Sequence, residues 1–472
     1  MVSVLFVNAV DPVSEVESRY PPLWPAYLAA YAEKHIGSEN LSFRLLAGDL
    51  AQELDRFRPD IVAIGSASQN FPFALQSAGL AKKKGAVVVV GGPHISALPQ
   101  CLSQDMDVGC IGEGEQTFCE LLQVLLEYGC FPTDRLRAVP GIAFRDKGTL
   151  VLTPPRDLIP KLDDIPHPKR SVVGYERDPY IIASRGCPYK CAYCSSSQFW
   201  KRYRFASAEY VVEEIVELAG HGARLIRFND DLFVANKQRV KRIIELLNKH
   251  GLLGKVAFSV SFRANLVSEE LVSLLKAMNV VSVTMGLESG CQKTLDYLKA
   301  NVTVADNERA VNLFKEAGIQ ANGFFVIGSP YETHEDIQET YQFVRRSRVD
   351  FFNVYVLTPL PGTRVWDFAA EKGLVSENMD WHRLNMNFEY NSARAVYVSQ
   401  TLTPEEILRW YRKFRRLRLL KILRALPGSP WLRDIPRVAL GVLKEELKRF
   451  WRRFLGKEAP LPETSASRQM GG

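Results

Sequence analysis

The chain has 472 residues, more than one compact core holds, and this length predicts roughly three domains. Its 46% hydrophobic and 24% charged residues are typical of a globular protein and exclude a mainly disordered chain. No stretch approaches the roughly 20 apolar residues of a membrane-spanning helix, and the N-terminus carries no basic leader, so we expect neither an integral membrane protein nor an exported one.

The net charge of +7 is unevenly distributed along the chain. Residues 405–472 carry 17 Lys and Arg against 7 Asp and Glu, whereas residues 1–404 carry 43 against 46. The body of the protein is therefore near neutral, and we expect no nucleic-acid partner.

Residues 1–130 alternate short β-branched runs with helix-like stretches, which predicts an α/β domain with an open, doubly wound, Rossmann-like parallel sheet. The expected strands are 4–10, 43–47, 60–65, 87–91 and 108–112, and the expected helices are 25–35, 71–84 and 115–128. Ligands of such sheets bind beyond the carboxyl ends of the strands. These ends carry Ser66, Ser68, Gly91, Gly92, His94, Gly112, Glu113 and Gly114.

Residues 131–179 contain eight prolines and are predicted to form a linker with a small hairpin at 142–152. Residues 180–375 then repeat a strand–helix pattern six times, which predicts a partial or full (β/α)6 TIM-type barrel with its active site at the carboxyl ends of the strands. The expected strands are 180–184, 225–228, 257–262, 281–285, 321–327 and 352–357, and the expected helices are 207–219, 237–249, 268–277, 304–316 and 334–347.

The C-terminal region, residues 376–472, is predicted to be helical and basic at 404–425 and 436–455, with a disordered tail from residue 460. An apolar stripe containing Trp451 lies beside a Lys/Arg face in the second helix. Such a helix either lies in a membrane interface or packs on the barrel, and both alternatives stay open. Trp410, Phe414 and Leu417 extend the apolar stripe.

Three of the eight cysteines lie within eight residues: Cys187, Cys191 and Cys194 form C-x3-C-x2-C directly after a predicted strand. Three thiolates on one loop can bind one corner of a metal centre. A structural zinc ion would need a fourth ligand, and no Cys or His is near in the sequence. A catalytic zinc ion would lack the H-x-E partner of the deaminases. A [4Fe–4S] cluster held by three thiolates leaves one iron open for an exchangeable ligand.

This cysteine spacing, with the aromatic residue Tyr193 before the last cysteine, resembles the signature of the radical S-adenosylmethionine (SAM) superfamily. The resemblance implies that SAM binds the open iron of a [4Fe–4S] cluster and is cleaved to a 5′-deoxyadenosyl radical. It also implies SAM contacts at successive strand ends. The matching positions are Asp230 and Asp231 for the methionine part, Ser259 and Arg263 for the carboxylate and ribose, Glu288 in a G-x-E-S-G element, and residues 324–330 with Glu332 along the adenine.

Each of these strand-end residues alone also has a structural explanation as a helix cap or a salt-bridge partner. Their order behind the cysteines favours the functional interpretation.

The first domain resembles the cobalamin-binding domain of the cobalamin-dependent radical SAM subgroup. The resemblance rests on Gly91-Gly92-Pro93-His94, on Ile111-Gly112-Glu113-Gly114-Glu115 and on residues 21–28. It implies that cobalamin binds at the strand ends, through the eight residues named above, including His94 and Glu113. The D-x-H-x-x-G motif that supplies a lower axial histidine is missing, so we expect His94 to hydrogen-bond the cofactor or to pack. A flavodoxin-like sheet without cofactor is the alternative.

The sequence therefore predicts a cytoplasmic cobalamin-dependent radical SAM enzyme that methylates an unactivated carbon of a small-molecule or lipid-like substrate. Flavodoxin or ferredoxin is the expected type of electron donor, and peripheral contact with the inner face of the membrane would involve the C-terminal helix. Cyclisation, rearrangement or oxidation with the same cofactors is the alternative chemistry. A non-catalytic cobalamin- or lipid-responsive binding protein is the alternative from another class.

Overall fold

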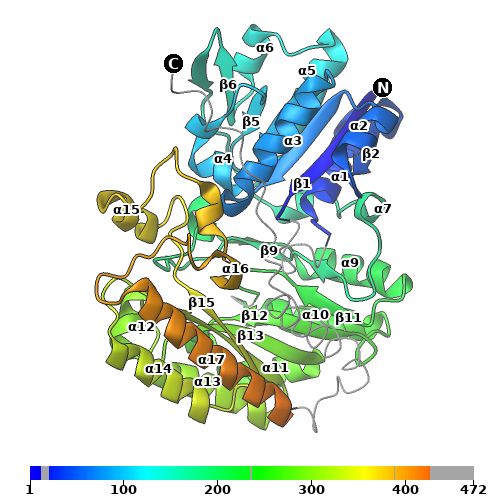
Figure 1. The fold of residues 1–472 in the computed structure, drawn as a ribbon. Coiled ribbons are helices and arrows are strands. Elements are labelled where there is room, and N and C mark those ends of the chain that lie inside the picture. Colours follow the sequence, from blue (N-terminus) through cyan, green and yellow to red (C-terminus); the bar gives the residue numbers. More distant parts are fainter. Residues whose placement is uncertain (12–20, 234–235, 387, 426–472) are drawn as a thin grey trace, which may run out of the picture. The chain divides into compact units, whose positions relative to one another are not determined.

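The computed structural model describes residues 1–11, 21–233, 236–386 and 388–425 (Figure 1). Residues Met1–Leu417 form one compact unit that contains a mixed seven-stranded sheet and a parallel six-stranded sheet, and Arg418 begins a second unit. The helix predicted at 436–455 and the tail from residue 460 lie outside the described residues. No helix in the described part of the chain is both long and apolar enough to cross a bilayer.

The N-terminal sheet has seven strands in the order β2-β1-β3-β4-β5-β6-β7, and the first five run parallel. Its strands are β1 (Val2–Ala9), β2 (Leu41–Leu45), β3 (Ile61–Ser66), β4 (Val87–Gly91), β5 (Val108–Cys110), β6 (Ile142–Asp146) and β7 (Thr149–Leu152). Its helices are α1 (Trp24–Ile36), α2 (Leu50–Phe57), α3 (Phe71–Lys83), α4 (Pro93–Ala97), α5 (Glu115–Tyr128) and α6 (Thr133–Ala138). The sequence pattern does not predict α2, α4 or α6.

Burial on both faces explains the continuous apolar character of these strands. Alternate residues of β1 enter different cores: Val4 and Phe6 pack in the cluster that includes α1 and α5, whereas Leu5 and Val7 pack in the cluster that includes α2 and α3. The predicted doubly wound sheet is therefore confirmed.

The hairpin predicted within the linker forms as β6 and β7, but it does not stand alone. Residue Ile142 pairs with Cys110, so β6 adds to β5 in antiparallel orientation and the hairpin extends the first sheet. The rest of the linker contains α7 (Arg170–Val173) and leads into the second sheet.

The second sheet has six parallel strands in the order β15-β14-β13-β12-β11-β8. Because β8 and β15 are its two edges, the described strands form an open, partial barrel. The strands are β8 (Tyr180–Ile181), β11 (Leu225–Phe228), β12 (Ala257–Phe262), β13 (Val280–Glu288), β14 (Gln320–Ile327) and β15 (Phe351–Val356). The outer helices are α9 (Ala208–Gly220), α10 (Lys237–Lys249), α11 (Glu269–Ala277), α13 (Val304–Glu316) and α14 (His334–Arg346), and shorter helices are α8 (Ser196–Trp200), α12 (Gln292–Leu298), α15 (Arg364–Glu371) and α16 (Phe388–Asn391).

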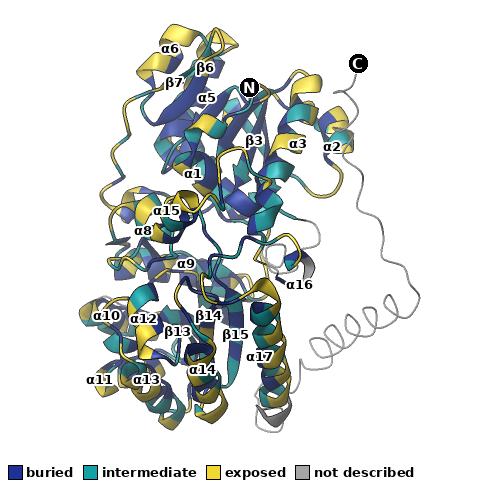
Figure 2. Cartoon of the chain, turned by 60° about the vertical axis from the view of Figure 1, so that its left-hand side comes forward, coloured by how far each residue is buried: buried dark blue, intermediate teal, exposed yellow. Residues whose placement is uncertain are grey.

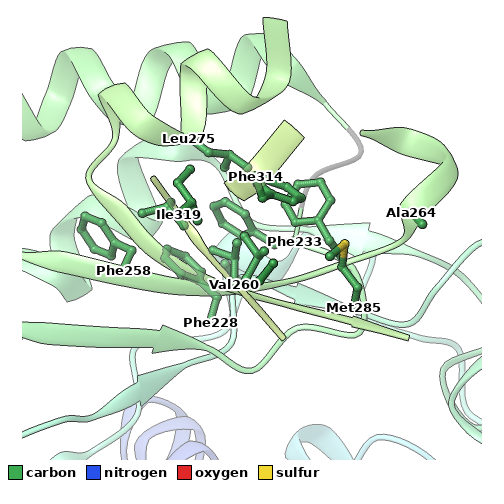
Figure 3. Close-up of a cluster of buried hydrophobic side chains, with 14 of the residues drawn as sticks. Phe228, Phe233, Phe258, Val260, Ala264, Leu275, Met285, Phe314 and Ile319 are labelled. Carbon is green, nitrogen blue, oxygen red and sulfur yellow. The ribbon is translucent and has the colours of Figure 1, made fainter. Parts of the chain in front are cut away.

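Strand alternation divides the barrel into an apolar outer side and a polar inner side. Phe258 and Val260 of β12 pack with Phe314 of α13 in the core between sheet and helices (Figure 3). Ser259 and Ser261 of the same strand point to the opposite face and stay half-exposed. The inner face is therefore free to carry polar binding groups.

The first barrel strand is shorter than predicted, since residues 180–184 divide between β8 and β9 (Ser184–Arg185). The carboxylate of Asp230 accepts hydrogen bonds from the Ala183 N–H at 2.8 Å and the Ser184 hydroxyl at 2.7 Å. These bonds turn the chain away from the sheet. β9 then pairs antiparallel with β10 (Arg204–Phe205).

The apolar stripe of α17 (Pro404–Ala425) covers the barrel up to Leu417 (Figure 2), and the alternatives for residues 436–455 stay untested because these residues lie outside the described part of the chain. Phe414 is fully buried, with its ring centroid 5.4 Å from that of Tyr341 and 6.5 Å from that of Phe352. The indole N–H of Trp410 donates to His334 at 2.9 Å. These side chains of α17 therefore pack against the barrel.

We expect the Phe414→Ala substitution to lower the free energy of unfolding by about 3–5 kcal/mol, because it leaves a cavity in the core under α17. Arg412→Ala, at an exposed position of the same helix, is the control and should change stability by less than about 0.5 kcal/mol. Urea denaturation measures both values. Equal stabilities of the two variants would contradict the packing of α17 on the barrel.

Candidate active site

The three cysteines lie on the loop that joins β9 to β10. Gly186, which opens the loop, has φ +82°, and a Cβ atom there would lie 2.6 Å from the carbonyl oxygen of Arg202. The middle of the loop is anchored by two backbone hydrogen bonds, from the Ala192 N–H to the Leu298 carbonyl at 2.9 Å and from the Val365 N–H to the Ala192 carbonyl at 3.2 Å. The loop is thus held at a fixed shape.

The thiols of Cys187, Cys191 and Cys194 are all free and half-buried. Burial raises the pKa of Cys194 to about 11, and burial also raises the pKa of Cys187; in both cases the neighbouring thiols of the loop contribute in the same direction. The three sulfurs therefore share one environment. In the described part of the chain, no three Cys, His, Asp or Glu side chains lie close enough together to hold a single metal ion, and this includes the three cysteines.

Arg263, predicted near the SAM carboxylate and ribose, contacts the cysteine loop. Its guanidinium donates to the Cys191 sulfur at 3.6 Å and lies 3.9 Å from the ring centroid of Tyr189. Further bonds to Asn265 and to the Ala300 carbonyl hold it in place, and the residue is only 5% exposed. A permanent positive charge is therefore fixed against one cysteine.

Glu288, at the end of β13, joins the cysteine loop to a lysine that the sequence analysis missed. Lys299 is buried and donates to Glu288 at 3.2 Å and to the Gly286 carbonyl at 2.5 Å. Burial, together with the Glu288 carboxylate, raises the pKa of Tyr193 well above its usual value. A Cβ atom on Gly286 would lie 2.1 Å from Glu288, which explains the glycine of the G-x-E-S-G element.

Asp230 and Asp231 differ in their surroundings. Asp230 is buried, and burial raises its pKa to about 6 while its oxygens accept the bonds from Ala183 and Ser184 described above. Asp231 is exposed and accepts a hydrogen bond from the Ser196 hydroxyl. Asp231 and the half-exposed Ser259 of β12 are therefore open to a ligand. Asp230 instead braces the start of the cysteine loop.

Glu332 carries a buried oxygen with no partner in the described part of the protein. Its Oε2 accepts from the Gly328 N–H at 2.6 Å and the Ser329 N–H at 3.2 Å, whereas its Oε1 and the Ser329 hydroxyl make no hydrogen bond. Burial raises the pKa of this carboxyl to about 8.

In the first domain, the strand ends around His94 are covered by protein. Its Nδ1 is hydrogen-bonded to Ser68 at 3.1 Å, and the rings of Phe71 and Trp381 pack against it at centroid distances of 3.9 and 4.5 Å. Burial lowers the pKa of His94 to about 3, so the imidazole is neutral. Its Nε2 is buried without a partner among the described residues.

Three further predicted residues lie at this edge, and two of them, Ser66 and Gly92, determine the local path of the backbone. Ser66 donates to the neighbouring Ala67 carbonyl. A Cβ atom on Gly92, where φ is +104°, would lie 2.6 Å from the Ser66 carbonyl oxygen, whereas Gly91 has room for one. Gly92 therefore lets β4 turn closely past β3.

The side chain of Glu113 contacts the two strands that flank the cysteine loop. The sequence did not predict this contact. The Glu113 carboxylate accepts hydrogen bonds from Arg185 and Arg204. Burial alone would raise the pKa of Glu113, but the two guanidiniums outweigh this effect and keep the carboxyl below its usual range. Gly114 packs on Leu28, whereas Gly112 has φ +80° and open space where a side chain would be.

A cavity of about 350 Å³ lies where four parts of the fold meet. One wall comes from the β4 and β5 ends, including Gly112 and Glu113, and another from α8, directly after Cys194. A third comes from Gly362, beyond β15, and the fourth from the linker, through Gly141 and residues 152–153 and 155–158. A Cβ atom on Gly362 would lie 3.9 Å from Ala97 and from Gln198, which is ordinary contact, so the φ of +79° and not the space favours glycine there. The size is within the usual range of ligand pockets.

Sequence comparison gives two independent domain matches. The profile of the radical SAM superfamily matches residues 181–344, and that of the B12 binding domain matches residues 10–122. An uncharacterized methyltransferase of Pyrococcus horikoshii is 32% identical over 410 residues, which cover 83% of this chain and 86% of that protein. The chain belongs to the cobalamin-binding radical SAM enzyme family.

Other relatives differ in the reaction named for them. An anaerobic magnesium-protoporphyrin IX monomethyl ester cyclase of Cereibacter sphaeroides is 28% identical over 461 residues, covering 92% of this chain and 73% of that protein. The solved structure of TsrM from Kitasatospora setae, a radical SAM methyltransferase with tryptophan bound, superposes with a TM-score of 0.66 at 20% identity, covering 79% and 77% of the two chains. That likeness shows the fold.

Family membership gives this radical SAM enzyme a [4Fe–4S] cluster, SAM and cobalamin as cofactors. The donor set fits the cluster: three thiols on one anchored loop match a centre that keeps one iron open, and a four-iron cluster needs its thiolates farther apart than a single ion does. The open space at Gly112 lies at the end of β5 beside the cavity, so a ligand can approach the backbone there without meeting a side chain.

We expect Arg263→Gln to shift the cluster potential by about 60 mV in the negative direction. A cation that donates to a ligand sulfur favours the reduced, more negative cluster, and 59 mV is the one-electron equivalent of roughly 1.4 kcal/mol, about one hydrogen bond to a charged group. Redox titration monitored by EPR measures the shift. Arg345→Gln, an exposed position on α14, is the control. An unchanged potential in a fully loaded Arg263→Gln protein would contradict the contact.

We expect the wild type to lose stability relative to Glu332→Gln as the pH rises from about 5 to about 8. The folded-state pKa of Glu332 is raised above its unfolded value of 4.5, so folding favours the protonated carboxyl. That advantage is complete below the unfolded pKa and is lost as the pH rises through about 8, at up to about 1.4 kcal/mol per pH unit. Thermal unfolding midpoints across this range test it, and parallel curves for the two proteins would contradict it.

Proposed function

We propose that this radical SAM enzyme transfers a methyl group to an unactivated carbon of a small-molecule or lipid-like substrate. The observation that carries the proposal is the cavity at Gly112, which is bounded on one side by the end of the first sheet and on the other by the helix that follows Cys194. A cofactor held at the sheet end would lie next to the cysteine loop.

When bound, the cluster with SAM supplies a hydrogen-abstracting radical, and methylcobalamin supplies the methyl group. The protein's part is binding, orientation and exclusion of water. Cys187, Cys191 and Cys194 would hold the cluster, with Arg263 compensating its negative charge. Tyr193, Glu288 and Lys299 would form the wall behind it.

SAM binding would use the inner face of the barrel. Asp231 and Ser259 offer polar groups there, and the unpartnered Oε1 of Glu332 beside Ser329 offers a protonated donor at neutral pH. Asp230 would act indirectly, by holding β9 in position. On the cobalamin side, Gly112 would allow close approach of the ring, and Ser66, Ser68, Gly91, Gly92 and His94 would lie at the neighbouring strand ends; Gly114 packs on Leu28 and would act only by allowing that contact.

The partners follow from this chemistry. A one-electron donor such as flavodoxin or ferredoxin would reduce the cluster, and a cytoplasmic location suits both the free thiols and such a donor. A nucleic-acid substrate is not expected, because residues 1–404 are slightly acidic. Membrane contact would involve residues 436–455, because α17 packs on the barrel up to Leu417.

A second candidate reaction is cyclisation without methyl transfer. It is favoured by the 28% identity to the Cereibacter sphaeroides cyclase over 461 residues. Both reactions need the same cofactors, so only the product distinguishes them.

The test is anaerobic reconstitution with iron, sulfide and hydroxocobalamin, followed by metal analysis and incubation with SAM labelled in its methyl group. We expect four irons and one cobalt per chain. Transfer of label to cobalamin and then to a substrate supports methyl transfer, and cofactor loading without label transfer supports cyclisation. Four irons without cobalt would refute both.

The cysteine assignment has a matched control. Cys191→Ala should lose the cluster and SAM cleavage, whereas Cys130→Ala, at an exposed position of the first domain, should retain both. A full cluster in Cys191→Ala would contradict the assignment.

A further inference from the structure

Both ends of the cysteine loop meet at one short ribbon. β9 enters the loop and β10 leaves it, and these strands pair antiparallel with Arg185 directly opposite Arg204. Residues 186–203, which include all three cysteines, lie between these two arginines. Whatever holds the arginines therefore holds the base of the loop.

A single carboxylate of the first domain contacts both arginines. Oε1 of Glu113 accepts from Arg185 at 2.8 Å and from Arg204 at 2.7 Å, and Oε2 accepts from Arg204 at 3.0 Å. The linker joins the same group, since the Ile159 N–H donates to Glu113 at 3.0 Å and its carbonyl accepts from Arg204 at 2.5 Å. Three separate segments thus converge on Glu113.

A second carboxylate neutralises the group. Glu115 accepts from Arg185 at 2.6 Å, so two acidic and two basic side chains form a buried, charge-balanced cluster. All four side chains are at most 9% exposed. The Arg185 guanidinium also lies between two aromatic rings, 5.5 Å from that of Tyr27 on α1 and 5.1 Å from that of Trp200 on α8.

We infer that this four-residue cluster is a clamp that sets the position of the cysteine loop relative to the cobalamin-binding sheet, and that Glu113 is a positioning residue rather than a cofactor ligand. The inference rests on the proposed function, in which cofactors on the two sides act on one substrate. Glu113 lines the cavity, yet its carboxylate oxygens are taken by Arg185, Arg204 and Ile159.

The physical reason is the directionality of paired buried charges. A buried ion pair is weak evidence for stability, because desolvation offsets much of the attraction, but it tolerates few alternative arrangements. An apolar contact in the same place would allow the two sides to slide. Forked guanidiniums on one carboxylate define both distance and angle.

The test measures the separation of the two cofactors. In the reconstituted protein, the reduced cluster and cob(II)alamin are both paramagnetic, so pulsed EPR gives the distribution of distances between them. We expect one narrow distribution in the wild type and a distribution at least about twofold broader in Glu113→Gln. Glu214→Gln, which breaks the equally buried Arg170–Glu214 pair away from the loop, is the matched control and should keep the wild-type distribution. Wild-type distances in fully loaded Glu113→Gln would overturn the inference.

A second measurement separates this inference from the proposed function. If the wild type binds no cobalt, the proposed function fails, and hydrogen exchange of the cofactor-free full-length chain then tests the clamp alone. Residues 186–203 should exchange about tenfold faster in Glu113→Gln than in Glu214→Gln. Equal rates would overturn the clamp. If Glu113→Gln does not fold, Glu113→Asp, which keeps the charge but shortens the reach, is measured in both experiments with the same expectations.

Discussion

Two buried guanidiniums on one carboxylate determine where the cysteine loop begins and ends. Neither Arg185 nor Arg204 could stay buried without a compensating charge, since an unpaired buried charge costs several kcal/mol. The first domain supplies that charge through Glu113 and Glu115. The loop that carries the three cysteines is therefore tied to the cobalamin-binding sheet by electrostatic necessity.

The two sheets contribute to the site for the same topological reason. The first five strands of the first sheet and all six of the second run parallel, so their carboxyl ends gather at one edge of each sheet and bring residues from distant parts of the chain together. Glycines occupy the places of closest approach: Gly92 beside β3, Gly186 at the start of the cysteine loop and Gly286 beneath Glu288. The family's chemistry needs two large cofactors close to one substrate. The strand ends and these glycines bring the two parts of the site together within one compact unit.

Sequence motifs predict groups of site residues that are neighbours in the chain, but not the long-range contacts that their side chains make. The cysteine triplet, Glu288 and the glycine-rich strand ends follow from motifs whose residues are neighbours in the chain. Lys299 and Trp381 were missed because each acts through a partner that is far away in sequence or on another element. Asp230 was expected at SAM, but its carboxylate braces β9, since a motif gives a residue's position and not the direction of its side chain. The sequence did not indicate that Glu113 and Glu115 are buried. Their pairing with Arg185 and Arg204 is visible only in the folded protein.

The amino-acid sequence by itself determined the two parallel sheets, their helices and the loop with three thiols, because hydrophobic periodicity and short motifs act over neighbouring residues. Only the tertiary structure decided that the linker hairpin joins the first sheet, that α17 covers the barrel up to Leu417 and that Glu113 faces the cysteine loop. These outcomes depend on which buried charge or apolar face finds which partner. The partners are selected by packing between segments that lie tens of residues to about a hundred residues apart. No local sequence pattern predicts such pairings.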